Sequence, residues 1–306
     1  MDAWLAPLLG RRSGMALVAV GGLGRRELCP GSDLDLVLMH RGRGDPRQVA
    51  EGLWYPIWDA GLGLDHSVRT VKEALRVAAE DLKAALGLLD ARLVAGDAEL
   101  AADLAERAGH QWRRRSATGL AQLAESVTAR HHEFGEVAFL LEPELKEGRG
   151  GLRDVVALRA AAAATDLVEA DPAPVVEAYD VLLGVRVELH SRTGKGGDRL
   201  LLQEQDAVAE ALGYGDADDL MAAVAAAART IAWAGDDAWR RVSSALAGPK
   251  GRPADRTLGP GLLLRDGEVV LAGGFDAAAD PSLTLRAAAA AAEVDAPLAR
   301  TALAQL

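Results

Sequence analysis

The sequence has one cysteine and few aromatic residues. Cys29 is the sole thiol among 306 residues, and Phe, Trp and Tyr together make up 4%. A single thiol cannot close an intramolecular disulfide or form a cysteine-based zinc site, which excludes a secreted disulfide scaffold and favours a cytoplasmic protein. The low aromatic content and abundant alanine favour helices that pack through small side chains.

Long hydrophobic runs and a positive net charge are also missing. Pro7 and Arg12 interrupt the short apolar stretch at the N-terminus, and no apolar run reaches about 18 residues, so neither an export signal nor a membrane span is expected. The net charge of −11 repels phosphate backbones. A nucleic-acid partner is therefore disfavoured, and a protein or a free nucleotide is the better substrate.

The chain is long enough for two domains, each with its own core. Strand signals are concentrated near its beginning, and long helical patterns rich in alanine and leucine follow. The expected fold class is α+β, with a small mixed sheet and helices over 1–100 and a mostly helical domain over 101–248. Residues 249–306 are expected to form a linker, a short hairpin and a terminal helix.

Three strands are predicted in the first domain. Ala16–Val20 is a short apolar run that ends in Gly21-Gly22, as a buried strand ending in a tight turn would. Asp33–Met39 alternates with period two and predicts the second strand. Apolar spacing predicts a helix over about Pro46–Asp59, followed by a third strand near Leu64–Val71.

Near the C-terminus, Gly248–Gly261 is rich in glycine, proline and charge, which predicts the linker. Two apolar runs then flank Asp266-Gly267, a hairpin signal. A final helix is predicted from Ser282.

Asp33 and Asp35 are the residues that point most directly to chemistry. Residues two apart on a strand share a face, so their carboxylates lie side by side, about 6–7 Å apart along the chain. Paired carboxylates of this kind can hold two magnesium ions during in-line attack on an α-phosphate. The alternative interpretation is a solvent-facing edge strand.

The Gly21-Gly22 turn is a candidate phosphate cradle. Glycines let backbone N–H groups approach phosphate oxygens closely, and Ser32 and Arg25 could add a hydroxyl and a positive charge. Most glycine turns only reverse the chain. The combination of this turn with the Asp-Leu-Asp sequence that follows it is what indicates a phosphate site.

The run VGGLGRRELCPGSDLDLVLMH, from Val20 to His40, resembles the signature of the polymerase-beta nucleotidyltransferase superfamily. In detail it resembles the bacterial PII uridylyltransferase family, whose members both add and remove uridylyl groups. Three further segments resemble that family in the same order: HSVRTVKEAL (His66–Leu75), EPELKEGRGGLRDV (Glu142–Val155) and DRLLLQEQDAVAEALGY (Asp198–Tyr214). The resemblance implies a polymerase-beta-type domain followed by a helical one.

The resemblance also implies a third metal-binding carboxylate from a neighbouring strand, and Asp65 is the best-placed candidate. Asp65 could instead cap a turn. Arg69 would share its face and could hold phosphate, although a structural ion pair is equally expected. The implied metal ligands are therefore Asp33, Asp35 and Asp65, with Mg²⁺ as the cofactor and Mn²⁺ as an alternative.

The helical domain contains a basic, glycine-containing loop that opens a helix, a natural place for an anion; its residues are Lys146, Gly150, Gly151, Arg153 and Asp154. The resemblance implies that this loop faces the nucleotide. Without it, the loop would be an ordinary helix start. His131-His132-Glu133 is interpreted as a surface segment, because adjacent helical positions point about 100° apart.

The reaction implied by the resemblance is transfer of a nucleoside monophosphate from UTP to a tyrosine hydroxyl of the PII nitrogen-signalling protein. ATP remains an alternative donor, since the alanine-rich composition resembles the actinobacterial branch. A template-independent RNA nucleotidyltransferase and a non-catalytic interaction module are the rival classes. The family's hydrolase and glutamine-sensing domains are not recognisable in the sequence, so transfer without removal is expected.

Overall fold

The structure is a computed structural model that describes residues 1–10, 12–42, 45–251, 254–275 and 277–306. The chain divides into two compact units, Met1–Ala238 and Trp239–Leu306. The first predicted domain, 1–100, and most of the second, 101–248, therefore lie in unit 1. The boundary between them near residue 100 stays a prediction.

Unit 1 begins with a four-stranded mixed sheet and the helices that cover it. The strands are β1 (Met15–Ala19), β2 (Leu34–His40), β3 (Leu64–Arg69) and β4 (Arg92–Gly96). The helices are α1 (Asp2–Leu9), α2 (Gly21–Gly24), α3 (Pro46–Asp59), α4 (Val71–Glu80), α5 (Leu82–Leu89) and α6 (Ala98–Arg114). The expected α+β class, with a small mixed sheet and helices, is confirmed.

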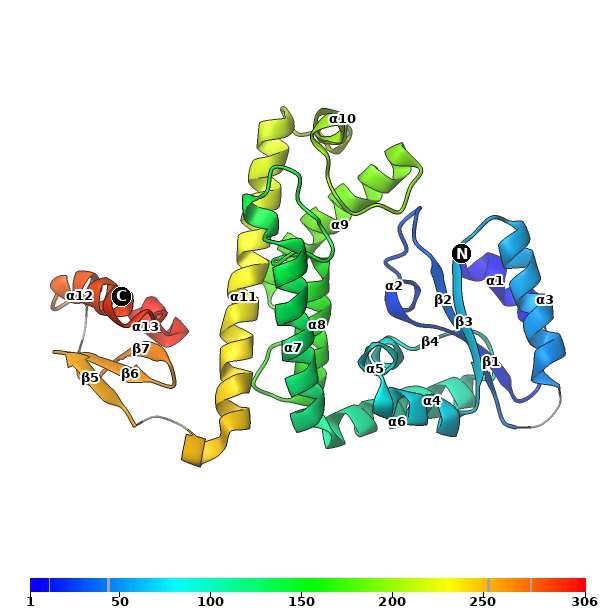
Figure 1. The fold of residues 1–306 in the computed structure, drawn as a ribbon, viewed down its shortest axis with the longest axis horizontal. Coiled ribbons are helices and arrows are strands. Elements are labelled where there is room, and N and C mark those ends of the chain that lie inside the picture. The colour runs from blue at the N-terminus through cyan, green and yellow to red at the C-terminus, as the bar shows by residue number, and fades with distance from the viewer. Residues whose placement is uncertain (11, 43–44, 252–253, 276) are drawn as a thin grey trace. The chain divides into compact units, whose positions relative to one another are not determined.

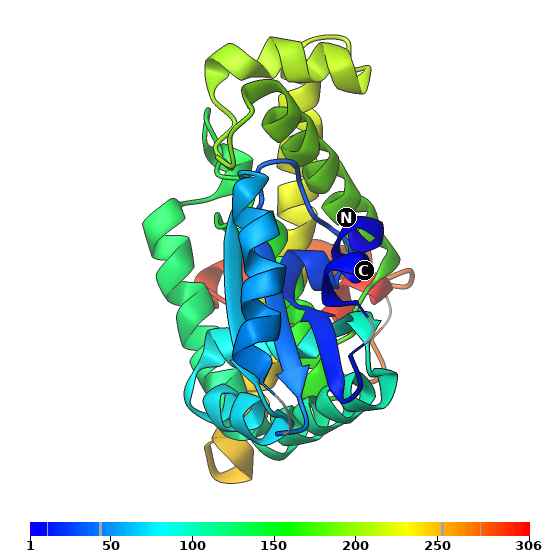
Figure 2. The same cartoon turned by 90° about the vertical axis from the view of Figure 1, so that its right-hand side faces the viewer.

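The strand order is β3-β2-β1-β4, and β2 with β3 is the parallel pair of this sheet. The connection from β2 to β3 runs through α3. This helix begins at Pro46, and the Asp45 side chain caps its first turn by accepting hydrogen bonds from the backbone amides of Arg47 and Gln48. In the view of Figure 2, α3 lies over the strands. The parallel pairing places Asp35 directly opposite Asp65.

Both faces of the sheet are buried, and the alternation of β2 separates them. Leu34, Leu36 and Leu38 pack with α1 and α3, while Val37 and Met39 pack with α4, α5 and α6. Figure 1 shows α1 and α3 on one side of the sheet and α4 to α6 on the other, toward the helical bundle. Odd-numbered residues of β2, Asp35 included, therefore face the helical part of the unit.

The rest of unit 1 is helical. It contains α7 (Ser116–Phe134), the short 3-10 helix Val137–Phe139, α8 (Leu152–Ala164), α9 (Ala173–Thr193), α10 (Leu202–Leu212) and α11 (Ala217–Gly251), which runs on into unit 2. Their core is formed by aliphatic side chains of α8 to α11 together with Val137 and Leu145. Trp112 of α6 donates its indole N–H to the Ala160 carbonyl at 2.8 Å, which joins the sheet-covering helices to α8.

Unit 2 contains a three-stranded antiparallel sheet of β5 (Arg256–Gly259), β6 (Leu262–Arg265) and β7 (Glu268–Leu271), followed by α12 (Ser282–Val294) and α13 (Arg300–Gln305). The predicted hairpin at Asp266-Gly267 and the helix from Ser282 are confirmed. Leu262, Val269, Leu283 and Ala287 are buried together in the small core of this unit.

Two expectations about strands are wrong. The short strand β4 was not predicted, because it has five residues and begins and ends with Arg92 and Gly96. The predicted linker Gly248–Gly261 contains β5 and the end of α11, which breaks helical geometry at Gly248 with φ +67°; its residues 252–253 lie outside the described residues. No helix among the described residues is long and apolar enough to cross a membrane.

Candidate active site

A large cavity of about 810 Å³ lies in unit 1 between the sheet and the helical part. It is lined by the ends of β2 and β3, by the turn after β1, and by side chains of α5, α7, α8 and α9. The sequence-predicted residues on its lining are Gly21, Gly22, Arg25, Ser32, Asp33, Asp35, Asp65, Arg69, Lys146 and Arg153. Segments far apart in the sequence therefore meet around one volume.

Three aspartates form the acidic side of this cavity. Asp35 lies within β2 and pairs in register with Asp65 of β3, and Asp33 directly precedes β2. The pKa of the Asp35 carboxyl is raised by burial and by the negative charge of Asp65, which Lys83 opposes and Asp33 reinforces. Asp35 thus lies where a cation would be stabilised.

The three carboxylates do not converge on one point in this structure. The Asp35 Oδ2 atom lies 2.7 Å from the position that a Cβ on Gly21 would occupy, Asp33 packs against Gly63, and Asp65 Oδ2 lies 3.4 Å from Lys83 Nζ. Among the described residues, no group of three potential ligands is close enough to hold a metal ion.

The donor set still fits Mg²⁺ in chemical type, because carboxylate oxygens on one face of a sheet are the ligands this ion prefers. Burial and the Asp65 charge raise the Asp35 pKa, and the nearby Lys83 and Lys146 offset this rise only in part. Coordination would require the Asp33 and Asp65 side chains to rotate toward Asp35.

The glycine turn lies beside these acids. Gly21 has φ +56° and begins the four-residue helix α2, for which no side-chain cap is found among the described residues. A side chain at Gly21 would collide with the Asp35 carboxylate. Glycine at this position therefore allows the turn and the acid to approach each other.

Arg25 lines the cavity, but its guanidinium already has partners. It donates to Glu27 at 2.7 Å and to Asp90 at 2.5 Å. Burial opposes its charge, yet the Asp90 and Glu27 carboxylates outweigh burial and raise the Arg25 pKa. Ser32 lines the cavity close to Asp33.

The helical side contributes positive charge through side chains. Lys146 and Arg153 line the cavity, with Lys146 Nζ 3.6 Å from Asp198 and Arg153 Nε 3.1 Å from Glu147. Together with Arg69, which lies on β3 four residues after Asp65, they place three cationic groups on the lining of the cavity.

The amide groups of the basic loop are used within the chain. Gly150 donates to Asp154 at 2.7 Å, and Gly151 donates to the Gly148 carbonyl at 2.9 Å. The buried Glu144 accepts from the amides of Lys146, Glu147 and Gly148. Gly150 and Gly151 are not on the cavity lining, so the loop contacts the cavity through side chains, and the expectation of an anion on its backbone is not supported.

His131 is not the surface residue that the sequence suggested. It is half-buried, and its Nε2 lies 2.9 Å from the buried Asp154 carboxylate, which also accepts from Arg130 at 2.5 Å. Despite burial, the bonds from His131 and Arg130 lower the Asp154 pKa. The sequence prediction treated His131 and His132 alike, but only His131 of these two faces the interior, where it contacts Asp154.

Several cavity residues were not predicted. Lys83 of α5, Arg130 of α7, and Tyr179 and Arg186 of α9 line the volume. They lie on helices. The periodicity of a helical sequence shows which residues share a face of the helix, but it does not show which other segment that face contacts. The available signal was a polar side chain among apolar helical residues, as at Tyr179 and Arg186 of α9.

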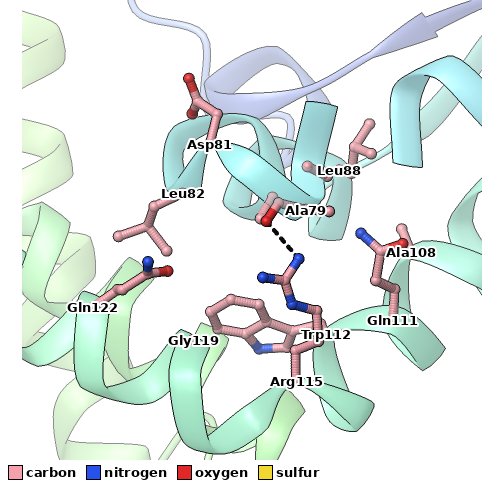
Figure 3. A pocket seen from close by; sticks show the side chains of 12 residues that line it. Ala79, Asp81, Leu82, Leu88, Ala108, Gln111, Trp112, Arg115, Gly119 and Gln122 are labelled. Carbon is pink, nitrogen blue, oxygen red and sulfur yellow. Dashed lines mark hydrogen bonds between the residues drawn. The ribbon is translucent and has the colours of Figure 1, made fainter. Parts of the chain in front are cut away.

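A second, smaller hollow of about 30 Å³ lies between α4–α5 and α6–α7. Figure 3 shows Arg115 donating to the Ala79 carbonyl above the Trp112 ring. A Cβ on Gly119 would lie 2.7 Å from that ring. The hollow reflects close packing of the helices. Asp81 lines both it and the large cavity, but Asp33, Asp35 and Asp65 line the large cavity alone.

The α+β fold has aspartates on two neighbouring strands beside a glycine turn and a helical part behind them, as a nucleotidyltransferase domain followed by a helical part would have. The model of the GlnD PII-uridylyltransferase family matches residues 118–235. The chain belongs to this family.

Relatives named bifunctional uridylyltransferase/uridylyl-removing enzyme agree with that assignment. The Streptomyces coelicolor protein is 48% identical over 100% of this chain and 39% of its own length. The Mycobacterium tuberculosis protein is 45% identical over 96% of this chain and 38% of its own. A Pseudomonas putida relative is 36% identical over 70% of this chain and 26% of its own. The chain thus spans about two fifths, or less, of these relatives.

Proposed function

We propose that the protein transfers a nucleoside monophosphate from UTP to a tyrosine hydroxyl of a PII signalling protein, with release of pyrophosphate. The observation that supports this best is the register of Asp35 opposite Asp65 on the cavity, with Gly21 against the Asp35 carboxylate. The names of the relatives favour a uridylyl donor.

In this proposal the triphosphate lies between the aspartates and the cationic side chains. Mg²⁺ held by Asp33, Asp35 and Asp65 would neutralise charge on the phosphates. The Gly21-Gly22 turn would donate backbone N–H groups. Arg69 on the sheet side, and Lys146 and Arg153 on the helical side, would supply positive charge to the phosphates.

The reaction forms a bond between the acceptor oxygen and the α-phosphorus and breaks the bond from the α-phosphorus to the bridging oxygen of the pyrophosphate. The tyrosine hydroxyl gives its proton to water as its oxygen attacks the α-phosphorus. The aspartates and the cationic side chains would hold the attacking and leaving oxygens in line.

The test is a transfer assay with magnesium, a PII protein, and UTP or ATP labelled on the α-phosphate, run in parallel. We expect label on PII from UTP, and no label when Asp35 is replaced by Asn. Label from ATP alone would make the protein an adenylyltransferase. Absence of label on PII from both nucleotides would refute the proposed acceptor.

A further inference from the structure

A partly buried polar network joins the glycine turn to the helical part of unit 1. Glu27, five residues after Gly22, accepts from the Tyr179 hydroxyl of α9 at 2.6 Å and from Arg159 of α8 at 3.2 Å. It also accepts from Arg25 at 2.7 Å. The Glu27 carboxylate therefore accepts hydrogen bonds from residues up to 152 positions away in the sequence.

Glu27 is coupled to the turn through the backbone. Its amide donates to the Gly22 carbonyl at 2.8 Å, and the Arg25 amide donates to the Gly21 carbonyl at 3.0 Å. Between them, Arg26 has φ +66°, a conformation that costs energy in any residue with a Cβ. Such a conformation persists when its surroundings fix it, and the Glu27 side chain provides that fixation.

The helical side of the network is rigid. Tyr179 is 4% exposed, and the Arg159 guanidinium lies 4.7 Å from its ring centroid while donating to Asp171 at 2.7 Å. Burial and the Glu27 carboxylate raise the Tyr179 pKa, so the phenol keeps its proton and donates. Glu27, Arg25 and Tyr179 all line the large cavity.

We propose that Tyr179 and Glu27 are positioning residues, whose hydrogen bond holds the Gly21-Gly22 turn in the geometry that binds a nucleoside triphosphate. The inference rests on the proposed function, because it assumes that the turn receives phosphates. It makes nucleotide binding dependent on α9, a helix with no predicted site residue.

The principal variant is Tyr179→Phe, which removes one oxygen and keeps the ring under Arg159. We expect the kcat/KM for the triphosphate to fall about tenfold or more, since displaced binding groups lose catalytic efficiency steeply. The matched control is Trp112→Phe, which removes another buried bond between the sheet-covering helices and α8 but does not touch the turn. We expect it to lower the melting temperature with less than about a twofold change in kcat/KM.

A double-mutant cycle keeps the inference testable if Tyr179→Phe folds poorly. Glu27→Gln should also weaken binding of a non-hydrolysable UTP analogue with magnesium, measured by calorimetry without PII. The double variant should lose no more than the worse single variant, because the two residues act through one bond. Two outcomes would overturn this inference and leave the proposed function standing: additive losses of binding affinity in the double variant, or a Tyr179→Phe variant that binds the analogue as tightly as the unaltered chain. Failure of the unaltered chain to bind the analogue would overturn the proposed function as well.

Discussion

At the scale of single residues, Asp35 combines burial with two acidic neighbours. Its pKa is raised by burial and by the charges of Asp65 and Asp33. A raised carboxyl pKa means that the ionised form destabilises the folded state at neutral pH, and that stability improves as the acid is neutralised. The arrangement is costly without a cation, which is the physical basis for placing one there.

The first prediction concerns Asp35→Asn. The variant should be as stable as the unaltered protein or more so at pH 7, because a buried charge beside like charges is removed without loss of volume. It should transfer no nucleotide. Thermal melts with and without Mg²⁺ and a nucleotide analogue check this, since the unaltered protein should gain stability on adding them and the variant should not. An active variant would contradict the metal assignment.

The sequence predicts which residues face the large cavity better than it predicts what they bind. Asp33, Asp35 and Asp65 reach the cavity, because strand parity is a local property. The hydrogen bonds of Arg25 to Asp90 and of Glu27 to Tyr179 could not be predicted from the sequence. The partners are 65 and 152 residues apart, and no local sequence pattern indicates which residues pair over such separations.

At the scale of elements, the α7–α8 junction depends on Asp154. This carboxylate is 4% exposed and accepts from Arg130, His131 and the Gly150 amide. Its pKa is lowered by the bonds and charges of His131 and Arg130, although burial works in the opposite direction. The ion pair should stabilise the start of α8, and with it the loop that carries Lys146.

The second prediction follows from that lowered pKa. A depressed carboxyl pKa contributes stability above its ordinary value of 3.8, and this contribution is lost as the pH falls through the folded-state value. Asp154→Asn should therefore cost about 3 kcal/mol at pH 7, because Arg130 loses the carboxylate that it contacts at 2.5 Å and is left with the more distant Glu147 carboxylate at 4.0 Å. The difference should narrow below pH 3.8. Urea unfolding across pH measures it, and a difference independent of pH would contradict the assignment.

The third prediction separates two glycines. Gly150 has φ +80°, and a Cβ there would collide with the Ala228 carbonyl of α11, so Gly150→Ala should cost about 2–4 kcal/mol. Gly184 lies inside α9 with open space around it, so Gly184→Ala should stabilise by about 0.5–1 kcal/mol. Chemical denaturation of both variants checks the contrast, and similar effects would argue against a structural role for Gly150.

Elements with a strong local pattern were predictable. The helix Pro46–Asp59 matches its prediction, and β1 to β3 lie within two residues of theirs. β4 and β5 were missed because they are short, contain glycine and arginine, and take their strand geometry from pairing with β1 and β6. Tertiary pairing determines these strands more than their own side chains do.

At the scale of the whole molecule, the charge balance separates the proposed enzyme from its RNA-acting rival. The net charge is −11, and two cationic side chains of the cavity, Lys146 and Arg153, are paired with Asp198 and Glu147. A surface of this kind has little attraction for a nucleic-acid backbone.

The fourth prediction is that the protein does not bind tRNA. Filter binding at low ionic strength, with protein in the micromolar range, should retain no more RNA than a neutral control protein does. Retention that falls steeply with added salt would indicate phosphate contacts and would favour the RNA nucleotidyltransferase alternative.

The fold brings the glycine turn, the acids of two strands and the cations of the helical part around one cavity, and the account depends on a divalent cation binding there. The most direct measurement is the anomalous scattering of Mn²⁺ in crystals grown with a non-hydrolysable UTP analogue. We predict a manganese peak between the carboxylates of Asp35 and Asp65, with the analogue's phosphates against Gly21 and Gly22. A peak at other residues, with both aspartates turned away from the phosphates, would contradict the account.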